Sequence, residues 1–93
     1  MSRQALGEIK EGAKKAHSLG DGSRFVLEII FPQSITDISF TNQAILITTN
    51  FFGIFSTEVM EFDFNISGSL AANGGLHKVV IENVGGEVIL SEI

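Results

Sequence analysis

The side chains that most often carry enzyme chemistry are few in this sequence and stand far apart. The two histidines are sixty residues apart: His17 ends a helical pattern and His77 lies in a strand pattern. Neither stands beside a nucleophile or at a spacing typical of metal ligands. The chain has no cysteine, which excludes disulfides, thiolate metal sites and a thiol nucleophile. We therefore interpret both histidines as surface residues and expect no catalytic residue, no cofactor and no metal.

Carboxylates and glycines are the other groups that could form a site. Glu61 and Asp63 fall on the same face of one strand pattern, with Glu58 close by, and paired carboxylates can bind calcium or transfer protons. The segment lacks the alternating oxygen donors of a calcium loop, so a solvated strand face is the simpler interpretation. The stretches "GDGS" and "NGG" do not have the spacing of a phosphate-binding loop, and we interpret them as turns.

Length and charge limit the fold and the partners. A chain of 93 residues predicts one domain. The formal net charge is −5, but residues 1–17 carry four basic and two acidic side chains, a net of +2, which leaves −7 on the remainder. An acidic body argues against nucleic acid as a partner, because phosphates bind to Lys and Arg. No apolar stretch approaches the roughly 18 residues of a membrane-spanning helix, and Met1 is not followed by a signal peptide.

The first 19 residues have the pattern of an amphipathic helix. Gly20 suits the left-handed residue that follows the last turn of a helix. The start has no comparable signal, because Ala5 stands three residues after Ser2, where a capping box needs Glu or Gln. We therefore predict a helix over residues 1–19 that is the end of a longer one. Its apolar face, which we expect to pack on the sheet or on another subunit, consists of Leu6, Ile9, Ala13 and Ala16.

Residues 23–93 have the pattern of a β domain. "RFVLEIIF" is apolar in both phases, so we expect it to be covered on both faces, whereas "VMEFDFNI" alternates and predicts a strand with one buried face. Turn residues at Thr41-Asn42-Gln43 and at Val84-Gly85-Gly86 predict two hairpins. The predicted fold class is mainly β, with an N-terminal amphipathic helix packed on an antiparallel β-sandwich or curled sheet of about six to seven short strands.

The run "FFGIFST" predicts a further strand in which Gly53 marks a bulge or a bend. Phe51 and Phe55 then share one side and Phe52 lies on the other, because successive side chains of a strand point to opposite faces. Burial on both sides is the simpler interpretation of these three residues, and contact with a partner is the alternative.

The tripeptide "NIS" at Asn65-Ile66-Ser67 is an N-glycosylation acceptor pattern. Asn65 falls on the polar phase of its predicted strand and close to a loop, where a glycan has room. The pattern matters only if the protein is exported.

The layout as a whole resembles the soluble domain of archaeal type IV pilin-like proteins, including accessory subunits of the archaellum. The residues that carry the resemblance are the helix ending in "LGDGS", then "PQSITDISFTNQAILI", "ISGSL" and the closing "GGLHKVVIENVGGEVIL", and they span roughly residues 5 to 92. In that family a cleaved class III signal precedes a long apolar helix, which anchors in the membrane or in a filament core. This sequence shows neither the signal nor the apolar half, and the helix of residues 1–19 would be the remaining part.

The resemblance implies a structural, non-enzymatic role: a subunit or accessory protein of an archaeal surface filament, a pilus or an archaellum, acting outside the cell. Its partners would be like subunits or other filament and cell-envelope proteins, with membrane contact only through a preceding segment. The alternative is a cytosolic or viral interaction module that binds a protein partner through a sheet edge or the Phe-rich run. An upstream apolar segment is expected under the first hypothesis, and a native start at Met1 under the second.

Overall fold

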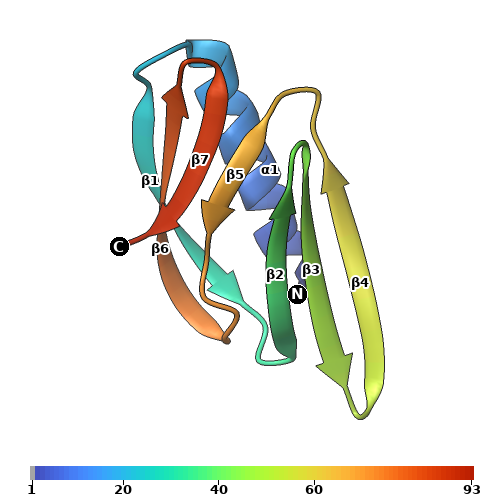
Figure 1. The fold of residues 1–93 in the computed structure, drawn as a ribbon. Helices are drawn as coiled ribbons and strands as arrows, with labels where there is room; N and C mark the ends of the chain where they lie inside the picture. Colours follow the sequence, from blue (N-terminus) through green and yellow to red (C-terminus); the bar gives the residue numbers. More distant parts are fainter. Residues whose placement is uncertain (1) are drawn as a thin grey trace.

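The computed structural model describes the backbone of residues 2–93 and the side chains of residues 6–93. Helix α1 (Ser2–Leu19) is followed by β1 (Arg24–Phe31), β2 (Ile35–Thr41), β3 (Ala44–Phe51), β4 (Ile54–Glu61), β5 (Ile66–Ser69), β6 (Gly75–Val84) and β7 (Glu87–Glu92). The described chain is therefore mainly β with one helix at its start, as the sequence predicts (Figure 1).

The strands form two sheets. One has the order β1-β6-β7-β5 and the other the order β2-β3-β4, and the two meet where β5 lies beside β2 (Figure 1). The Ile66 N–H donates to the Asn42 carbonyl at 2.9 Å across this junction. Every paired strand is antiparallel to its neighbour except β5, which runs parallel to β7. The predicted all-antiparallel arrangement is thus wrong at β5.

Glycine permits this parallel pair. Gly68 of β5 has a φ of +150°, and a Cβ at this position would collide with the Leu90 carbonyl of β7. The small residues Ser67, Gly68 and Ser69 therefore form part of a short strand whose backbone lies close to β7.

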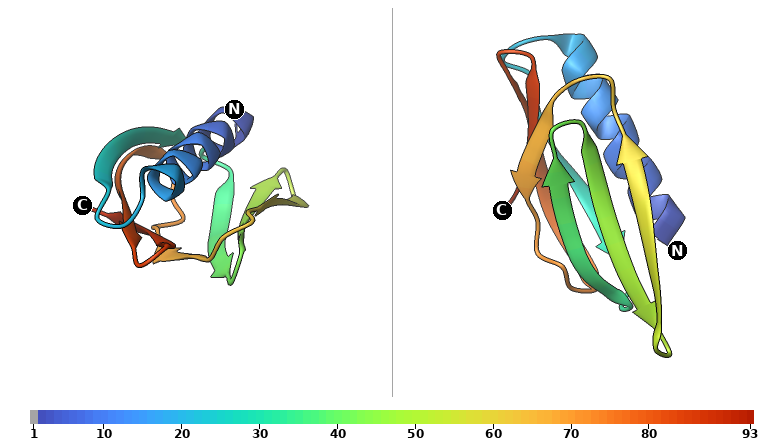
Figure 2. Two further views of the ribbon diagram at one scale, coloured as in Figure 1. Left: turned by 90° about the horizontal axis from the view of Figure 1, so that it is seen from above. Right: turned by 45° about the vertical axis from the view of Figure 1, so that its right-hand side comes forward.

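One face of α1 is buried. Leu6 is 7 % exposed, and Ile9, Ala13 and Ala16 are fully buried in a hydrophobic cluster that contains residues of both sheets. Seen from above, the helix lies across the side that the curved strands leave open (Figure 2). Gly12 allows a close approach, because a Cβ there would come within 2.7 Å of the side-chain ends of Leu27 and Ile81.

A side chain of the sheet forms hydrogen bonds with the last turn of α1. Gly20 has the predicted left-handed conformation, with a φ of +93°. The buried Asn83 amide of β6 donates to the Ala16 carbonyl at 3.1 Å and to the His17 carbonyl at 3.4 Å, and its oxygen accepts from the Gly86 N–H at 2.9 Å. Asn83 thus satisfies carbonyl groups that the last helical turn leaves without partners.

Two strand predictions are corrected. Val26 and Ile30 of β1 are 44 % and 70 % exposed, so β1 is covered on one face only, since α1 lies against the other. "VMEFDFNI" is not one strand: β4 ends at Glu61, β5 begins at Ile66, and residues 62–65 connect the two sheets. The apolar phase of the pattern is nevertheless buried throughout, at Met60, Phe62, Phe64 and Ile66.

Candidate protein-interaction site

The hairpin of β3 and β4 ends in a two-residue turn made of Phe52 and Gly53. Phe51 pairs with Ile54 across the ladder, and the φ angles of the turn residues are +53° and +81°. Positive φ at both positions is the requirement of the tight turn that best matches the twist of a hairpin. The sequence predicts one strand with a bulge or a bend at Gly53, and the structure instead has two strands there, because Phe52 and Gly53 form the turn between β3 and β4.

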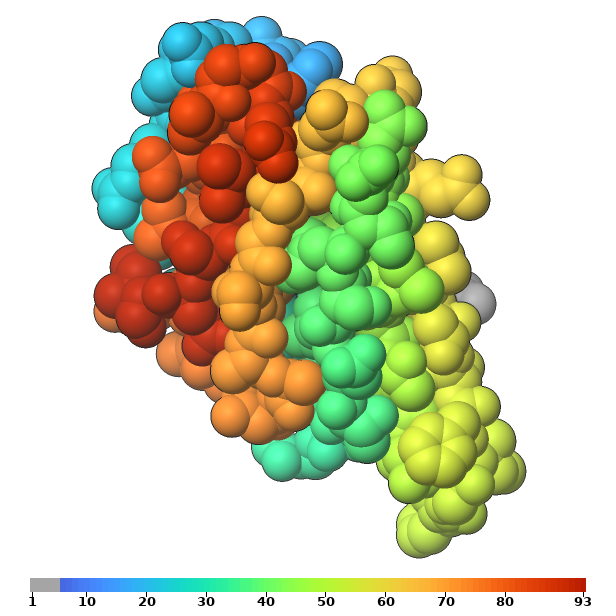
Figure 3. All heavy atoms as spheres, viewed as in Figure 1, coloured from blue at the N-terminus to red at the C-terminus, as the bar shows by residue number. Residues whose placement is uncertain are grey.

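The side chains around this turn are apolar and exposed. We define the hairpin tip as Phe51, Phe52, Ile54 and Phe55, which are 65 %, 92 %, 71 % and 67 % exposed. Burial on both sides is thus wrong for all three phenylalanines. Figure 3 shows the hairpin end projecting beyond the rest of the molecule at the lower right. Exposed apolar patches of this kind often mark binding surfaces.

The tip is apolar on both faces of the hairpin. Phe51 and Ile54 form one cross-strand pair and Asn50 and Phe55 the next, so the two pairs point to opposite faces. The prediction that Phe51 and Phe55 share a side is wrong because the turn lies between them. The tip is therefore a wedge, and it sits within residues 38–57, which contain no charged side chain.

Phe52 is poorly suited to its backbone position. A left-handed conformation costs an ordinary L-residue about 1–2 kcal/mol, and Asn or Gly is the usual choice in such turns. The Phe52 ring packs edge-on against Phe51, with ring centroids 4.6 Å apart, yet 92 % of the residue stays exposed. Folding alone gives little reason for a phenylalanine here, and strained residues concentrate at functional sites.

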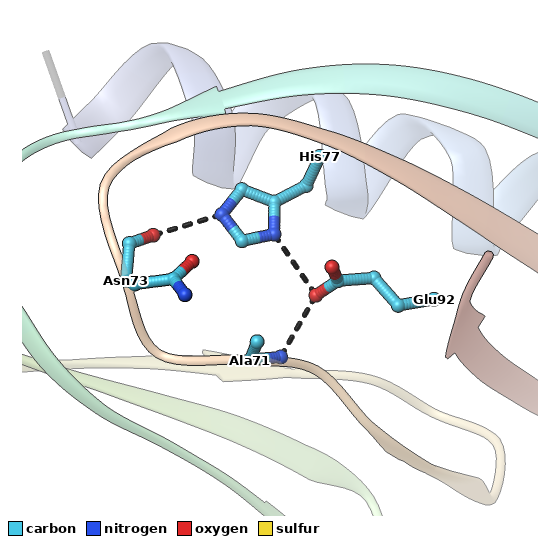
Figure 4. Close-up of polar contacts among 4 residues, drawn as sticks. All are labelled: Ala71, Asn73, His77 and Glu92. Carbon is cyan, nitrogen blue, oxygen red and sulfur yellow. Dashed lines mark hydrogen bonds and ion pairs between the residues drawn. The ribbon is translucent and has the colours of Figure 1, made fainter.

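His77 is a second feature of the structure, and the sequence interpretation of it as a surface residue is wrong. It lies on the inner face of β6 and is 4 % exposed, with its ring edge-on to Phe31. Figure 4 shows its surroundings: Nε2 lies 2.8 Å from the Asn73 carbonyl, and Nδ1 lies 2.9 Å from Oε1 of Glu92. Each ring nitrogen therefore lies close to an acceptor oxygen.

Glu92 joins this cluster to the loop before β6. Its Oε1 also accepts from the Ala71 N–H at 2.8 Å (Figure 4). Partial burial acts to raise the pKa of Glu92, but the Ala71 hydrogen bond and the interaction with His77 outweigh it and hold the pKa below its ordinary value of 4.5. The contacts tie the loop to β7 and bring no nucleophile to the histidine, so we interpret the cluster as structural.

The remaining sequence candidates do not converge. His17 is exposed and its ring stacks on Phe64 at 4.2 Å, while Glu61 and Asp63 are exposed on β4 and on the connection after it. Asn65 is exposed, and its carbonyl accepts from the Val88 N–H at 3.0 Å, so its glycosylation stays a prediction. Within residues 2–93, no group of three or more His, Asp or Glu is placed to hold a metal ion.

Among the described residues, no helix is both long and apolar enough to cross a membrane. No model of a protein family matches the sequence, and neither the curated proteins nor the solved structures contain a match to it.

Proposed function

We propose that this domain is a structural, non-enzymatic subunit or accessory protein of an archaeal cell-surface filament, pilus or archaellum, and that it acts outside the cell. The observation that carries the proposal is the hairpin tip, where three phenylalanines and one isoleucine are at least 65 % exposed. A subunit of an assembly needs an apolar surface that a neighbouring protein covers. Like subunits or other envelope proteins are the partners that fit this role.

The finer architecture forms part of the proposal. We propose that α1 packs on the two sheets as on one curled layer, in the way that the resemblance to pilin-like proteins implies. The buried helical residues Ile9 and Ala13 share one hydrophobic cluster with Ile29 of the first sheet and Ile45 of the second, which supports this view.

The coding DNA upstream of Met1 tests the filament role directly. We expect an in-frame short basic leader followed by about 20 apolar residues that continue into α1. An in-frame stop codon shortly before Met1, with a ribosome-binding site at that methionine, would overturn the proposal. Immunoelectron microscopy of the source cells is the independent check, with label expected along surface filaments.

A cytosolic or viral interaction module is the second candidate. The observation that favours it is β4, which lies at the edge of the described three-stranded sheet and exposes Phe55 and Val59. Such an edge can accept a strand from another protein. The same upstream DNA separates the two candidates, because this one predicts translation that starts at Met1 and label confined to the cell interior.

A further inference from the structure

His77 is a buried titratable group that the proposed function does not use. It is 4 % exposed, and its two ring nitrogens lie against oxygens of two different segments. Nε2 is hydrogen-bonded to the Asn73 carbonyl at 2.8 Å, whereas Nδ1 lies 2.9 Å from Oε1 of Glu92 and has no hydrogen-bond partner among the described residues. A carbonyl and an ionised carboxylate can only accept hydrogen bonds. Both oxygens beside the ring are therefore acceptors.

The number of protons on the ring decides whether both contacts are attractive. A neutral imidazole carries one N–H and one lone pair. If Nε2–H donates to Asn73, the Nδ1 lone pair lies 2.9 Å from a carboxylate oxygen of Glu92, and the two atoms repel. If Nδ1 carries the proton instead, the Nε2 lone pair lies against the Asn73 carbonyl. An imidazolium has no such lone pair, and its positive charge attracts the carboxylate, so it makes both contacts favourable.

The other elements around the ring bring no competing charge from their described residues. Phe31 of β1 lies edge-on to the ring, and α1 covers the same face of the sheet with buried apolar side chains. Residues 70–74 contain no charged side chain, and the exposed Lys78 points to the opposite face of β6. The recorded ion pair of His77 is with Glu92, whose lowered pKa keeps the carboxylate ionised at neutral pH.

These contacts hold the loop of residues 70–74. The loop passes around the end of β7, because β5 and β6 lie on either side of that strand (Figure 4). Glu92 of β7 accepts from the Ala71 N–H at 2.8 Å, and His77 of β6 is hydrogen-bonded to the Asn73 carbonyl. The pair of side chains thus fastens the loop to two neighbouring strands.

The same loop packs against the connection between the two sheets. This connection is the segment between β1 of the first sheet and β2 of the second. Gly74 lies so close to it that an added Cβ would come within 2.7 Å of the Gln33 Cα. A movement of the loop therefore changes the packing at a point where the two sheets are joined.

We propose that His77 and Glu92 form a pH-sensitive latch, which holds the 70–74 loop while the ring is an imidazolium and releases it when the ring loses a proton. On deprotonation, Nδ1 repels the carboxylate, and the Ala71 N–H loses its acceptor. The closed latch binds one more proton than the open one, so rising pH favours opening. Histidine is the side chain whose charge most readily changes near neutral pH. The inference goes beyond the filament role and does not depend on it.

NMR spectroscopy of the isotope-labelled wild-type protein tests the proposal. Nitrogen shifts of the ring report its protonation, and the exchange protection of the Ala71 amide, normalised to the rate of an unstructured peptide at the same pH, reports the latch. Between about pH 5 and about pH 8, protection should fall about tenfold, as for the loss of one hydrogen bond, with the midpoint of the His77 titration. The Val88 N–H, bonded to the Asn65 carbonyl at the other end of β7, is the internal control and should keep its protection.

Two variants identify the groups involved. Glu92→Gln keeps an oxygen for the Ala71 N–H and offers an amide N–H to the lone pair of a neutral Nδ1, so its Ala71 protection should stay nearly constant over this pH range. His17→Gln removes the other histidine of the chain, which is exposed, and should leave the response of Ala71 as in the wild type. Unchanged far-UV circular dichroism shows that each variant is folded.

Three results would overturn the latch proposal: a His77 ring that keeps one protonation state across this range, Ala71 protection that does not follow the ring titration, or an equal fall of protection in Glu92→Gln and the wild type. The last would assign the pH response to another group. None of these results bears on the upstream DNA, so the filament role is tested separately.

Discussion

Replacing Phe52 by asparagine should stabilise the fold even though it removes an aromatic ring. Asn-Gly is the preferred sequence for the turn that Phe52 and Gly53 form, because Asn tolerates a positive φ. The left-handed conformation costs an ordinary residue about 1–2 kcal/mol. The gain from the substitution is somewhat smaller than this cost, because Asn in the same conformation still has a small cost of its own.

The opposing loss is smaller. Phe52 is 92 % exposed, so almost no apolar area is returned to water. The edge-on contact with the Phe51 ring is worth about 0.5 kcal/mol at such an exposed position, the low end for aromatic pairs. The net expectation is a gain of about 0.5–1 kcal/mol, which corresponds to a rise in Tm of about 2–8 °C for a domain of this size.

Thermal unfolding followed by far-UV circular dichroism measures the effect, at a concentration where the protein is monomeric. Phe55→Asn is the matched control. It removes the same ring from an ordinary strand position, so it has no strain to relieve and should lower Tm. Equal losses of Tm in both variants would refute the reasoning, because they would show that ring packing rather than backbone conformation decides the residue at position 52.

Three further predictions concern the buried contacts. Ile9→Ala should lower the free energy of unfolding, measured by urea titration, by about 2–5 kcal/mol, because Ile9 is fully buried. The control Lys10→Ala, at the exposed neighbouring position, should change it by less than about 0.5 kcal/mol. Similar values for the two variants would place Ile9 outside the core. Asn83→Ala leaves the carbonyls of Ala16 and His17 without their donor and should lower stability by about 1–3 kcal/mol, and an unchanged Tm would contradict its role at the helix end. Because the pKa of Glu92 is lowered from 4.5, its carboxylate contributes stability that is present above that pH and is lost as the pH falls through the lower, folded value. The urea midpoint should therefore fall less between about pH 6 and about pH 3 in Glu92→Gln than in the wild type. An equal fall in both proteins would show that the Glu92 carboxylate does not stabilise the fold.

Local chemistry made part of the fold predictable. The left-handed Gly20, the Asn42-Gln43 turn and the Gly85-Gly86 turn follow from residues whose backbone preferences act over a few positions. Helical periodicity likewise marked a face of α1 that is buried, since side chains three and four positions apart share a face.

Contacts between distant segments account for most of the errors. The Phe52-Gly53 turn lacks the usual turn dipeptide, so the apolar run that contains it has the pattern of a strand. The alternation of apolar residues from Met60 to Ile66 indicates which side chains are buried but not which backbone groups pair in a sheet. The chain passes from one sheet to the other within this segment. The parallel pairing of β5 with β7 depends on a partner more than twenty residues away in the sequence.

The candidate site was predictable only in part. The apolar run contains too many apolar residues for one strand face, which singles out Phe51, Phe52 and Phe55 as candidates for partner contact. The pattern does not show how these three side chains are arranged. His77, by contrast, shares the strand phase of the buried Val79 and Ile81, a signal that indicates burial.

The pairing of β1 with β6 has a consequence for biosynthesis. The two strands join residues 44 to 58 positions apart, from Phe31 with Gly75 to Arg24 with Glu82. At translation rates of about 5–20 residues per second, β1 waits roughly 2–12 seconds for its partner to be made. The hairpins of β2, β3 and β4 close in the meantime, so the nascent chain completes its second sheet first and exposes the unpaired β1 to chaperones during that interval.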